Sequence, residues 1–198
     1  MQLESWKRLE ISLVLSALPW LEVYKERVQL EDGRTLDDFY RVALPDFAAV
    51  VPITEAGELV MIRTYKHGVG RVSLSSPAGL VNPGESPLLT AQRELLEETG
   101  YAASDWRPLG GFTVDGNRQC GKAHFFLARN ATRVAFAHNP DRNEVVEVQL
   151  ISPHNFLRAV EQGDVAMLAT VGAVSLAMLA LLAENGLRAT GFNPETTL

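Results

Sequence analysis

The alternation of apolar and polar residues predicts strands along the first third of the chain. Residues 21–30 (LEVYKERVQL) alternate with the period of two that strand side chains follow. Glu31-Asp32-Gly33-Arg34 has the composition of a hairpin turn, and residues 35–43 form the expected return strand. Residues 47–53 and 58–65 predict a second pair of strands, joined by a turn at Glu55-Ala56-Gly57.

A helix is predicted in the middle of the chain, from Glu85 to Gly100, because Leu88, Ala91 and Leu95 recur there at helical spacing. Ser86 and Pro87 are residues that begin helices, and Gly100 is one that ends them. Further strands are expected over 72–75, 106–114, 123–129 and 144–150, and further helices over 153–162 and 165–184. This order indicates an α/β protein with a mixed sheet.

Two long apolar runs need an interpretation. Ile11–Leu21 has the length of a signal peptide, but Glu4 and Glu10 precede it and no clear cleavage site follows, so we interpret it as a helix-like folded segment. Val165–Ala183 carries no charge and is long enough to span a bilayer. Because it is rich in small residues and no positive cluster flanks it, we expect a buried helix or a subunit interface. The expected protein is cytoplasmic and does not enter a membrane.

Charge and cysteine content exclude several classes of protein. The formal net charge of −6 argues against a protein that wraps nucleic acid, which needs a positive surface. A small phosphate-bearing ligand is still compatible, since a divalent cation can supply positive charge locally. The single cysteine, Cys120, excludes an internal disulfide and a cysteine-based zinc cluster.

The predicted central helix carries a cluster of carboxylates near its C-terminal end. Glu94 and Glu98 are four residues apart and share one face, with Glu97 beside them. These charges repel one another, and the negative end of the helix dipole adds to the cost. A hard divalent cation would neutralise them, and carboxylate oxygens suit Mg²⁺ or Mn²⁺. A solvated acidic face is the alternative. Arg93 can pair with Glu97 or reach back to Glu85.

The spacing of these residues resembles the Nudix box. The chain has Gly79, five residues, Glu85, seven residues, Arg93-Glu94-Leu95, one residue, Glu97-Glu98, one residue and Gly100. Every fixed position of the box is occupied, and Tyr101 follows where a small aliphatic residue is usual. The resemblance implies the Nudix α/β/α sandwich and a Mg²⁺-dependent hydrolase that cleaves a pyrophosphate bond.

The same resemblance implies roles for individual residues. Box glutamates bind the metal in this family, here Glu94 and Glu98 with help from Glu97, and the backbone carbonyl of Ala78 joins them in some members. Glu85, Arg93 and Glu97 are assigned to the catalytic machinery. A glutamate on a late loop acts as general base, and Glu144 occupies that place, with Glu147 as the alternative.

Residues outside the box resemble the ADP-ribose pyrophosphatase branch. The common features are an N-terminal β-hairpin arm, a strand that ends in Arg63-Thr64-Tyr65-Lys66, and the Pro-Ala-Gly entry to the box. The branch implies a homodimer in which the arm reaches across to the partner. It also implies that Trp20 and Phe39 stack the base, although either ring can equally be a structural residue. Arg63, Lys66 and Arg118 are candidates for contacts with phosphate or ribose.

The resemblance leaves the substrate open. Many ADP-ribose-specific members have a proline fifteen or sixteen residues past the box, where this chain has Gly116 and Asn117. The first expectation is hydrolysis of ADP-ribose to AMP and ribose 5-phosphate. GDP-mannose or another nucleotide sugar is the alternative substrate, and a non-catalytic nucleotide-binding module is the alternative of another class. The expected organisation is an arm at 1–45, made of a helix-like start and the hairpin, a catalytic domain at 46–186 and a tail at 187–198.

Overall fold

The computed structural model describes residues 5–135 and 145–184, which form two compact units. The first unit contains the chain up to Phe47 together with Gly111–Ala123. The second contains Ala48–Gly110 and the chain from His124 onward. The loop around Gly116, which the sequence analysis placed in the catalytic domain, therefore belongs to the first unit. The fold is an α/β fold with a mixed sheet, as expected from the sequence.

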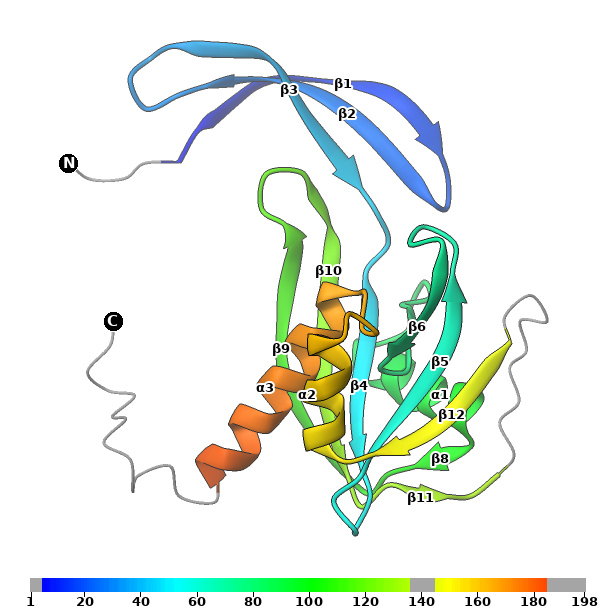
Figure 1. Cartoon of the computed structure of the whole chain (residues 1–198). Coiled ribbons are helices and arrows are strands. Elements are labelled where there is room, and N and C mark those ends of the chain that lie inside the picture. The colour runs from blue at the N-terminus through cyan, green and yellow to red at the C-terminus, as the bar shows by residue number, and fades with distance from the viewer. Residues whose placement is uncertain (1–4, 136–144, 185–198) are drawn as a thin grey trace. The chain divides into compact units, whose positions relative to one another are not determined.

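The first unit is an antiparallel meander of three strands, drawn in blue in Figure 1. These strands are β1 (Lys7–Ala17), β2 (Leu21–Gln29) and β3 (Thr35–Ala43). β1 pairs with β2, and β2 pairs with β3, both antiparallel. Val42 of β3 also pairs in parallel with Gln119, the first residue of β10 (Gln119–Arg129).

The helix-like start expected for the arm is wrong, because β1 occupies that segment. β1 lies at the edge of the meander and is paired with β2 from Lys7↔Gln29 to Ala17↔Leu21. The physical reason is a period of two. The apolar residues Leu9, Ile11 and Leu13 alternate with the polar residues Arg8, Glu10 and Ser12. The arm is consequently a three-stranded meander rather than a single hairpin.

The second unit contains most of the mixed sheet and the three helices found in the described residues. β4 (Phe47–Ile53) lies between β10 and β5 (Leu59–Lys66), and β12 (Val146–Ile151) pairs with β5. The remaining pairs are β6 (Arg71–Ser75) with β5, β7 (Ala78–Leu80) with β4, β9 (Asp105–Asp115) with β10, and β8 (Tyr101–Ala102) with β11 (Thr132–Arg133). The helices are α1 (Pro87–Thr99), α2 (Pro153–Glu161) and α3 (Leu168–Glu184).

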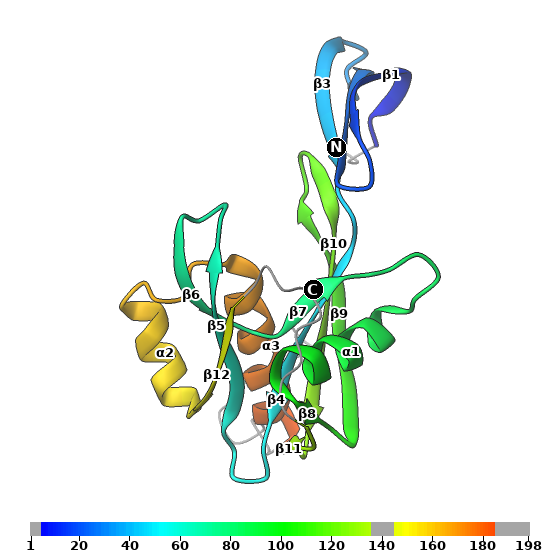
Figure 2. The same cartoon turned by 90° about the vertical axis from the view of Figure 1, so that its right-hand side faces the viewer.

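Strand register decides which side chains of the sheet face α1. Ala48 and Val50 of β4 share a core cluster with Ala91 and Leu95 of α1. Because Ile53 pairs with Leu59 and side chains alternate, the even-numbered residues of β5 point to the same face as Val50. The odd-numbered residues of β5 point to the other face, where α2 and α3 lie (Figure 2).

Helix α1 begins and ends as its sequence predicts. Ser86 caps the N-terminus, where its hydroxyl accepts a hydrogen bond from the Leu89 N–H at 3.3 Å. Gly100 ends the helix in the left-handed conformation, with φ of 73°, and its N–H donates to the Leu96 carbonyl at 2.8 Å. Of the helices in the described residues, α3 included, none is both long enough and apolar enough to cross a membrane.

Candidate active site

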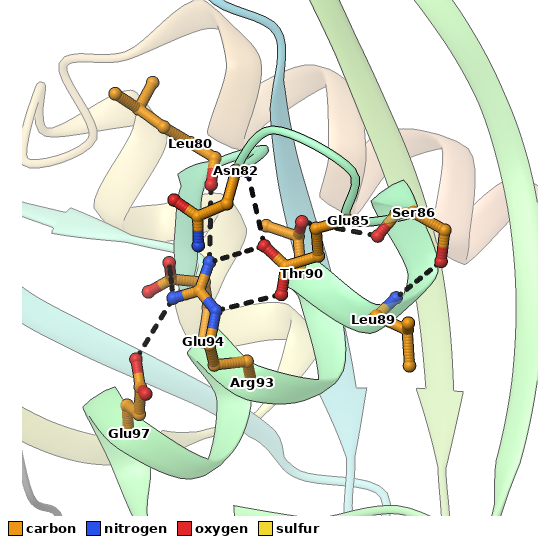
Figure 3. Close-up of polar contacts among 9 residues, drawn as sticks. All are labelled: Leu80, Asn82, Glu85, Ser86, Leu89, Thr90, Arg93, Glu94 and Glu97. Carbon is orange, nitrogen blue, oxygen red and sulfur yellow. Dashed lines mark hydrogen bonds and ion pairs between the residues drawn. The ribbon is translucent and has the colours of Figure 1, made fainter.

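Arg93 of α1 is the centre of the carboxylate cluster (Figure 3). Its Nε and Nη2 atoms donate to the two carboxylate oxygens of Glu85 at 3.0 and 3.2 Å. Its Nη1 atom donates to Glu94 Oε1 at 2.5 Å and to Glu97 Oε2 at 3.1 Å. The sequence left open whether Arg93 pairs with Glu97 or Glu85, and the structure shows that it pairs with both.

The same arginine fixes the loop between β7 and α1. Its Nη2 atom also donates to the Leu80 carbonyl at 3.3 Å. The loop closes on itself where Glu85 N–H donates to the Asn82 carbonyl at 2.9 Å and Asn82 N–H donates to Glu85 Oε2 at 3.3 Å. Since Glu85 is bonded at once to Arg93 and to Asn82, the loop and the helix are held together by one set of polar contacts.

The pKa values of the cluster follow from these contacts. Hydrogen bonds from Arg93, opposed by partial burial, lower the pKa of Glu85 from 4.5 to about 2. Pairing with Glu85 raises the pKa of Arg93, so the guanidinium stays charged. Burial raises the pKa of Glu94 despite the nearby Arg93. Additional positive charge near Glu94 would therefore stabilise its ionised form.

Gly79 of β7 lies directly against the Glu94 carboxylate. A Cβ atom added at Gly79 would be 1.8 Å from Glu94 Oε1 and 2.2 Å from Glu94 Cδ. No side chain larger than hydrogen fits there unless the carboxylate moves. The glycine that opens the box is thus explained by a close approach of the backbone to the Glu94 carboxylate rather than by a left-handed turn.

Glu98 is the most buried of the box glutamates, with 6% of its surface exposed. Its Oε2 atom accepts a hydrogen bond from the Ala78 N–H at 2.9 Å. Two consecutive residues of β7 therefore contact two carboxylates of α1: Ala78 contacts Glu98, and Gly79 contacts Glu94. The structure brings together Ala78, Glu85, Arg93, Glu94, Glu97 and Glu98, all of which the sequence assigned to the site.

The donor set fits a hard divalent cation. Carboxylate and carbonyl oxygens are the ligands that Mg²⁺ and Mn²⁺ prefer, and a partly buried carboxylate beside a bare backbone offers such oxygens at close range. Within residues 5–135 and 145–184, no three His, Cys, Asp or Glu side chains are already gathered closely enough to hold a metal ion. Glu94 is turned toward Arg93 and Glu98 toward Ala78, so both carboxylates must turn to share an ion.

Arg63 does not lie on the α1 face. Its Nη1 and Nη2 atoms donate to the two carboxylate oxygens of Asp164 at 2.6 and 2.9 Å, between α2 and α3. The substrate-binding role expected for Arg63 is therefore not supported, because both of these nitrogens are engaged with Asp164 on the opposite face of the sheet. This pair lowers the pKa of Asp164 and raises that of Arg63.

The other expected substrate residues lie in different places. Lys66 is half-buried at the end of β5, and its even position puts it on the α1 face. In the first unit, Trp20 is 66% exposed in the turn after β1. Phe39 makes an edge-to-face contact with Trp6, with ring centroids 6.1 Å apart, and the Arg118 guanidinium lies 6.0 Å from the Phe39 ring. Trp6 was not singled out from the sequence.

The general base expected from the sequence, Glu144, lies outside the described residues. The alternative, Glu147, pairs with Arg63 in the register of β12 and β5, so its side chain points to the face opposite α1. Glu147 also accepts a hydrogen bond from Gln149 Nε2 at 2.8 Å. The geometry therefore does not support Glu147 as the base.

Comparisons with known proteins identify a family and a fold. The NUDIX domain model matches residues 44–171, more than half of the chain. ADP-ribose pyrophosphatase of Bacillus subtilis is 30% identical over 73% of this chain and 78% of its own length. The methanol dehydrogenase activator of Bacillus methanolicus is 28% identical over 77% and 82%. A crystal structure of an ADP compounds hydrolase superposes with a TM-score of 0.80 at 22% identity, covering 94% of this chain and 98% of that one, which shows a shared fold.

The Glu85–Arg93 pair predicts how stability depends on pH. Because the pKa of Glu85 falls from 4.5 to about 2 on folding, its stabilisation is complete above pH 4.5 and is lost as pH falls toward 2. Glu85→Gln should lower the free energy of unfolding near pH 7 by roughly 2–3 kcal/mol, and the deficit should shrink toward pH 2. Urea unfolding between pH 2 and 7 measures this.

Glu55→Gln, in the exposed turn after β4, is the control and should follow the wild-type curve at every pH. A Glu85→Gln curve that runs parallel to wild type, with a constant difference, would contradict the assigned pair.

Proposed function

The chain belongs to the Nudix hydrolase family, and from this premise we propose that it hydrolyses the pyrophosphate bond of ADP-ribose to give AMP and ribose 5-phosphate. The observation that carries the proposal is the cluster of Glu85, Glu94 and Glu97 around Arg93, backed by β7. A purely structural acidic face would need neither a glycine pressed against Glu94 nor a buried Glu98.

We assign the cation to oxygens of α1 and β7. Glu94 and Glu98 would hold Mg²⁺, with Glu97 assisting and the Ala78 carbonyl as a further ligand. A bound Mg²⁺ polarises the pyrophosphate and lowers the pKa of the attacking water. Arg93 holds the carboxylates of Glu85, Glu94 and Glu97 close together, which their mutual repulsion would otherwise oppose. Mn²⁺ would satisfy the same ligands.

Substrate recognition is divided among three groups of residues in this proposal. Lys66, on the α1 face, would contact phosphate as a point charge. Phe39, with Trp6 and Arg118 beside it, would offer an aromatic and cationic surface for the base. Trp20 would offer an exposed ring on which the base could stack. Glu144 stays the proposed general base on the resemblance alone, since Glu147 faces away from α1.

ADP-ribose is preferred over other nucleotide sugars because of the relatives. Besides the Bacillus subtilis protein, the ADP compounds hydrolase NudE of Escherichia coli is 36% identical over 40% of this chain and 44% of its own length. The alternative, GDP-mannose or another nucleotide sugar, is favoured by the loop at Gly116-Asn117, which departs from the usual form of ADP-ribose-specific members.

We also propose a homodimer formed through β1. β1 is an edge strand of eleven residues, all exposed, and Ile11 and Leu13 form an apolar row on one face, 42% and 55% exposed. An exposed apolar edge of this length favours pairing with another strand. A second copy is the natural occupant, because antiparallel pairing of β1 with its own copy would place the same patch of both subunits in one closed interface.

The function is tested with purified protein, Mg²⁺ and a panel of ADP-ribose, GDP-mannose, UDP-glucose and NADH, with products identified by chromatography. We expect AMP and ribose 5-phosphate from ADP-ribose, and a loss of at least roughly 100-fold in kcat for Glu98→Gln because a cation ligand is removed. Glu58→Gln, in the turn after β4, is the control and should keep wild-type activity.

Each other outcome of this panel has a definite meaning. Preferential cleavage of another nucleotide sugar would overturn the substrate and keep the mechanism. Activity of Glu98→Gln equal to wild type would remove Glu98 from the mechanism and contradict the proposed cation site. No cleavage of any compound, together with no Mg²⁺ binding, would make the protein a non-catalytic nucleotide-binding module.

The dimer is tested by light scattering on Ile11→Lys. The wild type should have twice the 21.7 kDa mass of the chain, and the variant should become a monomer because a charge enters the apolar row. Leu157→Lys on α2, a residue of the second unit that is 55% exposed, is the control and should stay dimeric. A monomeric wild type, or a dimeric Ile11→Lys, would contradict the proposed interface.

A further inference from the structure

Three buried hydroxyls near the site have no hydrogen-bond partner among the described residues. They are Thr64 Oγ1, Ser75 Oγ and Ser76 Oγ. Thr64 is 2% exposed, Ser75 1% and Ser76 3%, so water from the surface does not solvate them. A buried hydroxyl without a partner destabilises a fold, and most such groups in native proteins are paired. Three of them in one short region of the chain require a physical explanation.

Register places two of these hydroxyls on the face of the sheet that α1 covers. Thr64 is an even-numbered residue of β5 and points with Ile62 toward α1. Ser75 of β6 pairs with Ile62, and Thr64 pairs with Ser73, so Thr64 and Ser75 are diagonal neighbours on one face. Helix α1 packs over both β5 and β7.

The chain connects these hydroxyls directly to the box carboxylates. β6 pairs with β5 and β7 pairs with β4, so the segment from Ser75 to Ala78 crosses from one strand to the other. Ala78, three residues after Ser75, donates its N–H to the buried Glu98 carboxylate. Ser75 is therefore three residues along the chain from the residue that contacts Glu98, and by register it shares with Thr64 the face of the sheet that α1 covers.

Ser73 shows that a buried hydroxyl with a structural role in this fold is hydrogen-bonded. Ser73 is fully buried on the same strand as Ser75 and lies beside the free edge of β6, where the Asp164 carbonyl also accepts a hydrogen bond from the Leu74 N–H at 3.1 Å. Its hydroxyl lies 3.2 Å from the Asp164 carbonyl, to which it donates, and it accepts from the Ala166 N–H at 3.0 Å. Ser73 thus ties β6 to the segment before α3. Ser75, two residues later, makes no corresponding bond within the described residues.

We propose that Thr64 and Ser75 are positioning residues for Glu98: when Glu98 turns to a bound divalent cation, their hydroxyls donate to its carboxylate, directly or through one buried water. A buried carboxylate needs donors on the side away from the cation, and second-shell donors of this kind fix the orientation of a ligand. The hydroxyls are assigned to Glu98 because it is the most buried of the box glutamates and already accepts a hydrogen bond from the Ala78 N–H. The inference rests on the proposed function, in that it assumes that Glu98 is a cation ligand.

This role predicts opposite effects on stability and on cation binding. Removing a hydroxyl that makes no bond in the fold should leave the melting temperature unchanged or raise it, since a desolvated polar group is lost. Removing a donor to a cation ligand should weaken binding of the cation by roughly tenfold. Removing a hydroxyl that has only a structural role would lower the melting temperature and leave cation affinity unchanged.

The test uses Thr64→Val and Ser75→Ala, which remove the hydroxyl with little change in shape, and Thr64→Ser, which keeps it. Mn²⁺ binding to the full chain without substrate is followed by electron paramagnetic resonance, and melting temperatures are measured in chelator. We expect Thr64→Val and Ser75→Ala to melt at or above the wild-type temperature and to bind Mn²⁺ roughly tenfold more weakly. Thr64→Ser should bind as wild type.

Ser73→Ala is the matched control, with the reverse expectation of a lower melting temperature and wild-type Mn²⁺ affinity. Wild-type Mn²⁺ affinity in both Thr64→Val and Ser75→Ala would overturn the inference, as would a fall in melting temperature like that of Ser73→Ala. If the wild-type protein itself binds no Mn²⁺ and cleaves nothing, the proposed function fails first, and the two failures are thereby distinguished.

Discussion

The arrangement of the site depends on one guanidinium group placed among carboxylates that repel one another. Arg93 contacts Glu85, Glu94 and Glu97 through three nitrogen atoms and also holds the Leu80 carbonyl before the helix. These contacts connect the β7–α1 loop to the helix and keep the pKa of Glu85 near 2. Without that positive charge, the acidic residues on α1 would favour an arrangement in which they are further apart.

The second constraint is the close contact between β7 and α1. Ala78 donates its N–H to Glu98, and Gly79 leaves room only for the Glu94 carboxylate. The sheet makes this contact possible because Val50 of β4 and Leu95 of α1 are buried in one cluster, which fixes the distance of the helix from the strands. The polar side chains of the site are therefore held in place by the apolar packing beside them.

Local signals in the sequence account for what could be predicted. Ser86 and Gly100 mark the ends of α1, and the spacing from Gly79 to Gly100 identifies the family. The start of the arm was misread because a compact apolar run obscured the period of two in β1. The partner of Arg63 could not be foreseen, since Asp164 is distant in sequence and only the fold brings them together. The unpartnered hydroxyls of Thr64 and Ser75 depend on strand register, which single residues do not reveal.

The central claim, that the carboxylates of α1 bind a divalent cation against β7, is tested most directly by Mn²⁺ binding to Gly79→Ala. The added Cβ would lie 1.8 Å from Glu94 Oε1, so it would crowd the space against β7 in which this carboxylate must turn to reach the cation, while the backbone of the glycine is not in the left-handed region. We predict a melting temperature close to that of the control Gly68→Ala and a loss of Mn²⁺ affinity of at least roughly tenfold. Wild-type Mn²⁺ affinity in a folded Gly79→Ala protein would contradict the account.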